Sequence, residues 1–215
     1  MKHTITKIEA QKNKRERVNI YINEEYSFSC SMELVYRYNL EKGRNVDLDY
    51  IKEVANEDNY IYCKETALRI IERTLKTEKE VIDKLQNKGF EKNVIDKVMD
   101  FLRQYDFVDD YKYVKCYMKE KLKVDGKKKI KFNLLKKGIA ESTIDEGFRF
   151  YDKDEDEYIN SLRKIAEKKY NSLKKQNLEQ IKLRKKLCDY LLRKGYSWSE
   201  VKLVSNELFN SSDFE

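Results

Sequence analysis

The residue types that usually carry enzyme chemistry are scarce in this chain or stand in unsuitable places. The only histidine among the 215 residues is His3, so a Ser-His-Asp set cannot be assembled in a stable core. No glycine-rich phosphate-binding sequence is present. The adjacent carboxylates Asp109 and Asp110 precede a helix expected from Tyr111, where an N-cap explains them better than a metal pair. We therefore expect no catalytic site and no enzyme activity.

The cysteines also give no metal site. Cys30, Cys63, Cys116 and Cys188 stand far apart, none forms a CxxC pair, and a single histidine cannot complete a zinc ligand set. We expect buried free thiols in a reducing cytosol. No metal and no cofactor are expected.

Lysine is the residue type that points to binding. Residues 111–138 contain eleven lysines and two acidic residues, a net charge of +9. Residues 67–110 contain nine basic and ten acidic residues, a net charge of −1. Lys127, Lys128 and Lys129 open an expected helix, where positive charge opposes the helix dipole, so helix stability does not explain them. This local excess favours a polyanionic partner.

The candidate binding residues form two basic stretches. They are Lys112, Lys115, Lys119, Lys121, Lys127, Lys128, Lys129, Lys131, Lys136 and Lys137, followed by Lys182, Arg184, Lys185 and Lys186. Tyr111, Tyr113 and Tyr117 interleave with the first lysines. At helical spacing such rings are usually part of a core, and stacking on nucleic-acid bases is the alternative.

The composition indicates helices that position these residues. Proline is absent and glycine occurs only six times, and both residues interrupt helices. Hydrophobic and charged residues each make up 40% of the chain, so small helical modules with charged surfaces are expected. No signal peptide or apolar run of about 18 residues is found, and we expect a cytoplasmic monomer without a membrane segment.

The N-terminal residues have a different pattern. Residues 17–22 alternate with a period of two, which is typical of a half-buried strand. Strands are also expected at 4–10 and 26–30, with a turn at 23–25. Two short helices, near 31–41 and 47–57, should cover this antiparallel sheet, and Gly43 should end the first of them.

A Lys-Gly-apolar landmark occurs three times in the helical part. The copies are Lys88-Gly89-Phe90, Lys137-Gly138-Ile139 and Lys194-Gly195-Tyr196. Relative to each glycine, apolar residues stand at positions −8, −4, +1 and +6. Positions −8 and −4 share a helix face, the glycine allows a left-handed turn, and the following residue should enter the core. Gly89, Gly138 and Gly195 therefore mark three similar units.

These units divide the chain into expected segments. Thr77 and Glu80 form a capping box that begins the helix before Gly89, and Ala67, Leu68, Ile71 and Leu75 share the face of the helix before it. The expected three-helix units span about 64–105, 110–151 and 156–209. The predicted domains are 1–60, 61–109, 110–155 and 156–215, with a charged joint at 152–157 and a frayed tail at 210–215.

The order of these motifs resembles the RecX family of bacterial RecA regulators. The resemblance covers nearly the whole chain. The matching segments are 5–9, 20–22, 67–69, 85–90, 107–113, 191–196, and Gly126, Ile130 and Leu134 with the second landmark. The N-terminal strands look like the extension of Gram-positive members.

The resemblance implies a mainly α-helical chain with three tandem three-helix repeats in a curved array after a small β segment. It also implies a non-enzymatic modulator that lies in the groove of the RecA–DNA filament. Such a protein inhibits RecA ATPase, strand exchange and coprotease activity and promotes filament loss. DNA contacts would go to the backbone and be weak without RecA. Two alternatives remain: a helical nucleic-acid-binding protein that acts without RecA, and a passive helical scaffold.

Overall fold

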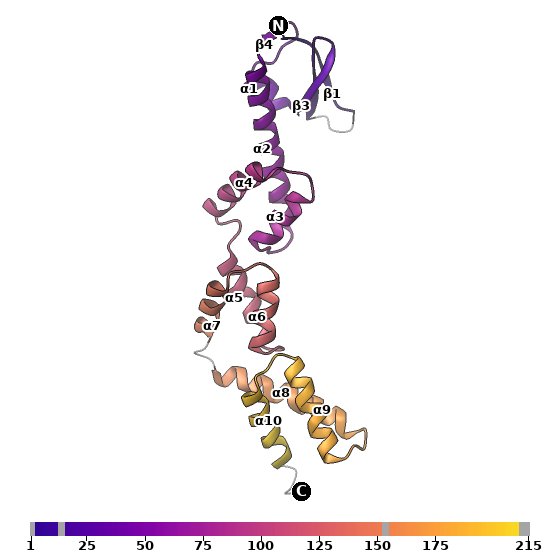
Figure 1. Cartoon of the computed structure of the whole chain (residues 1–215), viewed down its shortest axis with the longest axis vertical. Helices are drawn as coiled ribbons and strands as arrows, with labels where there is room; N and C mark the ends of the chain where they lie inside the picture. The colour runs from indigo at the N-terminus through magenta and orange to yellow at the C-terminus, as the bar shows by residue number, and fades with distance from the viewer. Residues whose placement is uncertain (1–2, 13–15, 152–154, 211–215) are drawn as a thin grey trace. The chain divides into compact units, whose positions relative to one another are not determined.

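The protein is mainly helical, with a small sheet at its N-terminus (Figure 1). The computed structural model describes residues 3–12, 16–151 and 155–210. Residues 152–154 of the expected charged joint and 211–215 of the expected tail lie outside this range. No helix within the described residues is long and apolar enough to cross a membrane.

The sheet has four antiparallel strands in the order β3-β2-β1-β4. Strands β1 (His3–Ala10), β2 (Arg17–Ile22) and β3 (Glu25–Ser31) confirm the three expected strands. The turn between β2 and β3 uses Asn23 and Glu24 at positive φ. The two-residue strand β4 (Asn45–Val46) was not anticipated, because it is too short to show a pattern.

Two helices cover this sheet, but their lengths differ from the expectation. Helix α1 (Met32–Arg37) ends well before Gly43, whose N–H donates to the Ile5 carbonyl oxygen and helps to hold β1. Helix α2 (Leu48–Glu72) is one 25-residue helix, so the expected short helix at 47–57 is wrong. Val54 packs in the core of the sheet, whereas Ala67 is buried within the first repeat. A single helix therefore covers the sheet with its N-terminal half and forms part of the first repeat with its C-terminal half.

The first repeat consists of α2, α3 (Glu78–Gln86) and α4 (Lys92–Gln104). Thr77 and Glu80 form the expected capping box, because each backbone N–H donates to the other's side chain at 3.2 Å. Leu75, expected on the buried face of the preceding helix, instead lies outside it and is exposed. The chain separates into two compact units, of which one contains residues 1–74 and 82–105 and the other contains 75–81 and 106–215.

The second and third repeats belong to the second unit. The second consists of α5 (Asp110–Lys121), α6 (Lys127–Lys136) and α7 (Glu141–Tyr151). The third consists of α8 (Glu155–Lys174), α9 (Gln180–Arg193) and α10 (Trp198–Asn210). Asp109 caps α5 as expected, because its carboxylate accepts from the N–H groups of Tyr111 and Lys112.

The three landmarks adopt the same helix-ending geometry. Gly89, Gly138 and Gly195 have φ values of 86°, 84° and 90°. Each glycine N–H donates over 2.9 Å to the carbonyl oxygen three residues earlier, and the next N–H donates over 3.3 Å to the carbonyl oxygen five residues before it. This pair of bonds defines a Schellman motif. Ile139 and Tyr196 enter the core as expected, whereas Phe90 is only half-buried and packs against Tyr62.

The prediction for the cysteines is only partly correct. Cys30 and Cys63 are buried, and burial raises the pKa of the Cys30 thiol to about 12 and that of the Cys63 thiol to about 11. Cys188 is half-buried and Cys116 is exposed on α5. The helical spacing around Cys116 does not by itself show which face of α5 is covered.

Candidate interface on the second repeat

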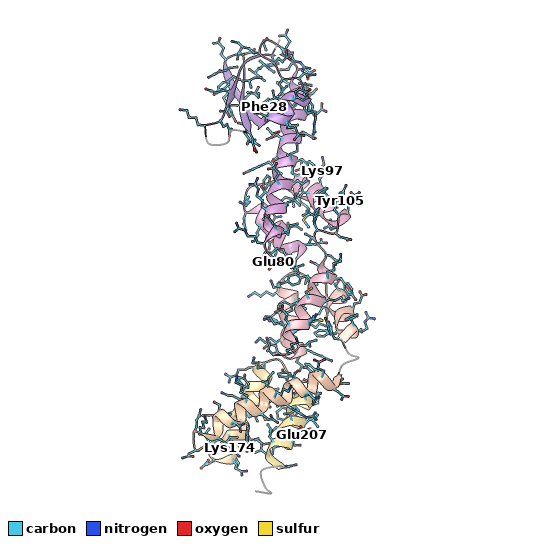
Figure 2. The ribbon with its side chains drawn as sticks, turned by 180° about the vertical axis from the view of Figure 1, so that it is seen from behind. Phe28, Glu80, Lys97, Tyr105, Lys174 and Glu207 are labelled. Carbon is cyan, nitrogen blue, oxygen red and sulfur yellow. The ribbon has the colours of Figure 1, made fainter. Side chains whose placement is uncertain are left out.

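The second landmark joins the second repeat to the first turn of α3. The Lys137 carbonyl oxygen accepts a 2.9 Å hydrogen bond from the Thr77 hydroxyl. The Lys137 ammonium donates to the Glu80 carboxylate over 2.5 Å (Glu80 is labelled in Figure 2). A Cβ atom at Gly138 would lie 2.6 Å from the Lys79 Cβ atom. The negative end of α6 therefore meets the positive end of α3, a favourable arrangement of helix dipoles.

The third landmark forms a similar joint with the start of α6. The Lys194 carbonyl oxygen accepts from the Gly126 N–H over 2.9 Å, and the Gly195 carbonyl oxygen accepts from the Lys128 N–H over 3.1 Å. The Lys194 ammonium lies 3.5 Å from the Asp125 carboxylate. The landmark lysine therefore reaches back to an acid of the preceding repeat in both joints. Within the described residues, Lys88 is exposed and forms no ion pair.

Several candidate lysines pair with acids inside the fold. Lys129 lies 2.9 Å from Asp125, and Lys131 contacts both Asp145 at 2.8 Å and Glu141 at 2.6 Å. The hydrogen bond that the Lys131 ammonium donates to the Asp145 carboxylate is the main reason why the pKa of Lys131 lies above its usual value. Together with Lys137, these residues stabilise the second repeat and its joints. Their ammonium groups are less available to a partner.

A second group of candidate lysines lies over aromatic rings. The ammonium groups of Lys115, Lys121 and Lys127 lie 4.1, 6.0 and 5.2 Å from ring centroids of Phe150, Tyr117 and Tyr158. Tyr111, Tyr113 and Tyr117 are half-buried, and Tyr113 and Tyr117 stack on each other, so these tyrosines are partly structural. Lys112 lies 3.7 Å from both Asp106 and Asp109.

Three candidates of the second repeat remain exposed without an acidic partner among the described residues: Lys119, Lys128 and Lys136. Lys128 and Lys136 lie on the same face of α6 as Phe132 and Leu135, which are 66% and 42% exposed. We call these four residues the α6 face. Sequence reasoning missed Phe132 and Leu135. A comparison of the three repeats could have found Phe132. Six residues before the landmark glycine, the first and third repeats have the polar residues Asp83 and Asp189, whereas the second has Phe132.

The candidates in the third repeat lie on α9. Lys182 pairs with Glu179 at 3.0 Å, and the Arg184 guanidinium donates to the Asn206 side chain. Lys185 and Lys186 are exposed and have no ion pair within residues 155–210. The structure thus does not gather all fourteen candidates into one site. It leaves a smaller set of free charges, concentrated on α5, α6 and α9.

These features define a class of protein: a short sheet followed by helical three-helix repeats, with a basic second repeat. Family models match three of its parts: the regulatory protein RecX N-terminal domain at residues 3–47, the RecX first three-helix domain at 63–102 and the RecX third three-helix domain at 155–204. The chain belongs to the RecX family of regulatory proteins.

Individual relatives agree with this assignment. Regulatory protein RecX of Clostridium acetobutylicum is 50% identical over 98% of this chain and 99% of its own length. Its counterpart in Clostridium tetani is 47% identical over 96% of this chain and 95% of its own length.

Solved structures also match. A crystal structure of regulatory protein RecX has a TM-score of 0.71 at 25% identity and covers 95% of this chain and 99% of its own. A RecX structure from Lactobacillus salivarius has a TM-score of 0.64 at 26% identity and covers 71% of this chain and 97% of its own. The family resemblance and the expected fold class are thereby confirmed.

Proposed function

We propose that this protein is a non-enzymatic modulator of RecA recombinase in the cytoplasm. It binds in the groove of the RecA–DNA filament, where it inhibits ATPase, strand exchange and coprotease activity and promotes filament loss. The family assignment supports this function. The observation that links this function to particular residues is the α6 face, where two lysines that have no acidic partner among the described residues flank two exposed apolar side chains.

The α6 face suits a protein partner with acidic and apolar surface. Phe132 and Leu135 together offer an apolar patch, and such patches on a soluble domain often mark interaction sites. Lys128 and Lys136 lie about two turns apart on either side of Phe132. Charges at the edge of an apolar contact mainly steer association and fix orientation. We therefore assign the α6 face to contact with RecA.

The direct test is DNA-dependent ATP hydrolysis by the cognate RecA with and without this protein. Wild-type protein should inhibit hydrolysis at stoichiometric amounts. The double variant Lys128→Glu/Lys136→Glu should require about tenfold more protein for half-inhibition, at roughly 0.5–1 kcal/mol for each reversed charge. Lys129 is left intact because it pairs with Asp125.

The matched control is Lys92→Glu/Lys97→Glu, which makes the same charge change at two exposed positions of α4. It should inhibit as wild type does. Absence of inhibition by the wild-type protein would overturn the proposed function, and equal inhibition by both double variants would overturn the role of the α6 face. Stronger binding to RecA-coated than to bare single-stranded DNA at matched salt separates this function from a nucleic-acid-binding protein that acts alone.

A further inference from the structure

A pocket of about 410 Å³ lies between the second and third repeats, inside the second compact unit. Its apolar lining comes from Met118 and Leu122 at the end of α5 and from Tyr158 on α8. Tyr158 is held in place because its hydroxyl accepts a hydrogen bond from the Lys127 N–H. The size lies within the range of small-ligand sites, which are about 300–1,000 Å³.

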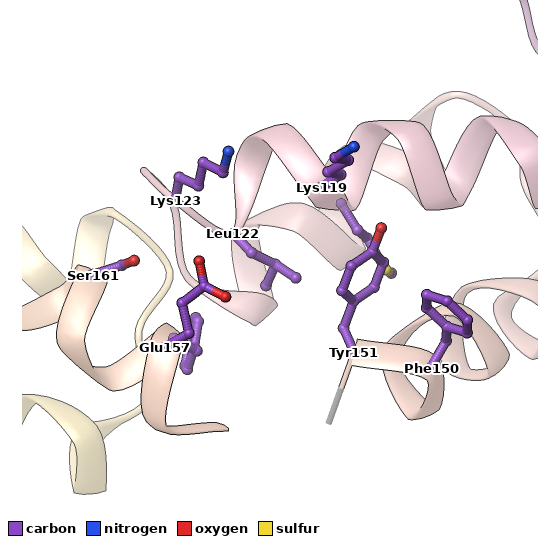
Figure 3. A pocket seen from close by; sticks show the side chains of 9 residues that line it. Lys119, Leu122, Lys123, Phe150, Tyr151, Glu157 and Ser161 are labelled. Atoms are coloured by element: carbon purple, nitrogen blue, oxygen red, sulfur yellow. The ribbon is translucent and has the colours of Figure 1, made fainter. Parts of the chain in front are cut away.

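One wall of the pocket presents aromatic rings from the end of α7 (Figure 3). The Tyr151 hydroxyl donates to the Lys115 carbonyl oxygen over 3.0 Å, which ties this wall to α5. Phe150 contacts Tyr151 edge to face and has the Lys115 ammonium 4.1 Å from its ring centroid, yet it remains 50% exposed. Phe150 is therefore an oriented aromatic surface that is open to a ligand.

The rim combines positive charge with hydrogen-bond acceptors. Lys119 and Lys123 are exposed, form no ion pair with any described residue and extend in the same direction in Figure 3. Lys115 and Lys119 stand one turn apart on α5, about 6 Å along its axis. Lys123 lies in the turn that follows the end of α5 at Lys121. Glu157 and Ser161 line the pocket from α8, opposite these lysines.

We propose that this pocket binds one nucleotide of a single-stranded nucleic acid. The base would pack against Phe150 and the apolar floor, and the adjacent phosphates would contact Lys119 and Lys123. Glu157 would accept a hydrogen bond from an amino group of the base, as carboxylates do with cytosine. Basic grooves with aromatic stacking surfaces bind single strands in this way. Paired bases of a duplex are stacked and could not enter.

This inference rests on the proposed function, because the DNA of the RecA filament would supply the nucleotide. The observations favour nucleic acid over an acidic protein segment, since the exposed Glu157 lines the same pocket as the two lysines. A base with an amino group satisfies Glu157 and the lysines together, whereas an acidic side chain would satisfy only the lysines.

The test measures binding of the full-length protein to a fluorescein-labelled oligodeoxycytidine by anisotropy, without RecA. An oligomer of the same length built from abasic residues is the reference ligand. Lys119→Gln/Lys123→Gln should weaken binding of both ligands and reduce the salt slope by about two. Phe150→Ala should weaken binding of the oligodeoxycytidine about tenfold but leave the abasic oligomer unaffected. Glu157→Gln should lower the preference for oligodeoxycytidine over oligothymidine.

Lys168→Gln, at an exposed position of α8, is the matched control and should bind as wild type does. Phe150→Leu replaces Phe150→Ala if circular dichroism shows that the alanine variant does not fold. Equal binding of the abasic and intact oligomers by the wild-type protein would overturn the pocket proposal. So would pocket variants that bind bare DNA normally but inhibit RecA less. Normal oligomer binding without inhibition of RecA would instead overturn only the proposed function.

Discussion

The Lys137 ammonium donates a 2.5 Å hydrogen bond to the Glu80 carboxylate and so joins the end of α6 to the first turn of α3. Both side chains are about a third exposed, so the pair is partly screened by water. The same two helix ends share the bond from the Thr77 hydroxyl to the Lys137 carbonyl oxygen. The landmark lysine thus belongs to the joint as well as to its own helix.

The first prediction concerns the strength of this ion pair. Lys137→Met and Glu80→Gln should each destabilise the protein by about 0.5–1 kcal/mol, because the surviving partner loses its hydrogen bond. The double variant should cost less than the sum of the two single variants. Urea unfolding of all four proteins measures the coupling. Lys88→Met, which alters a landmark lysine without an ion pair among the described residues, should change stability by no more than about 0.3 kcal/mol. Strict additivity would contradict the prediction.

The second prediction separates the three landmark glycines. Gly89→Ala should cost about 1–2 kcal/mol, because a Cβ atom strains the left-handed backbone, although no atom of the described residues lies within 4 Å of that Cβ position. Gly195→Ala should cost about 2 kcal/mol more, since its Cβ atom would lie 2.5 Å from the Lys129 backbone nitrogen. Gly138→Ala should fall between them, because its contact is with the Lys79 side chain. Denaturant midpoints with a constant m-value give the order, and three equal costs would refute it.

The third prediction concerns Gly126, whose φ of −76° suits any residue. Backbone conformation alone would make Gly126→Ala harmless. However, a Cβ atom there would lie 2.2 Å from the Gly195 carbonyl carbon. The substitution should therefore destabilise the protein by about 2–3 kcal/mol, because it forces apart the joint between the second and third repeats. Thermal unfolding followed by circular dichroism measures this loss. A midpoint equal to that of the wild type would show that the joint can move without cost.

The fourth prediction concerns acid stability. Burial raises the pKa of Glu80, but hydrogen bonds from Lys137 and from the Thr77 N–H outweigh it, so the pKa lies below its ordinary value of 4.5. A carboxyl with a depressed pKa contributes stability above its unfolded pKa and loses it as the pH falls through the folded pKa. Glu80→Gln should therefore lose less stability than wild type between about pH 5 and about pH 3.

Urea unfolding at several pH values tests this difference. Glu167→Gln removes an exposed carboxylate of α8 and is the matched control. This variant should follow the wild-type profile through the acid range. A Glu80→Gln profile that runs parallel to that of the wild type would exclude a contribution from the ion pair.

Much of the helical fold could be predicted from the sequence because its causes are local. Gly89, Gly138 and Gly195 end helices, and Thr77 and Asp109 begin them, through bonds to residues only a few positions away. The length of α2 could not be predicted in the same way. Its N-terminal half packs on a sheet and its C-terminal half packs in a repeat, so no single apolar stripe runs along it.

The binding surface was harder to predict, because the sequence shows charge but not pairing. Lys129, Lys131 and Lys137 looked equivalent to Lys128 and Lys136, yet the first three have acidic partners within hydrogen-bonding distance. Those partners come from the preceding turn, from α7 and from α3. The exposed Phe132 and Phe150 were also missed, because an aromatic residue at helical spacing is ordinarily assigned to a core.

The hydrogen bonds between the second and third repeats have a consequence for how the repeats can change over evolutionary time. Gly126 and Lys128 donate, and Lys194 and Gly195 accept, through backbone atoms alone. Substituting most surface side chains leaves such bonds intact. Each repeat is therefore free to acquire its own surface chemistry while the attachment to its neighbour persists, provided that the two glycines are retained. Gene duplication followed by divergence would then produce copies that are alike in backbone and specialised in what they bind.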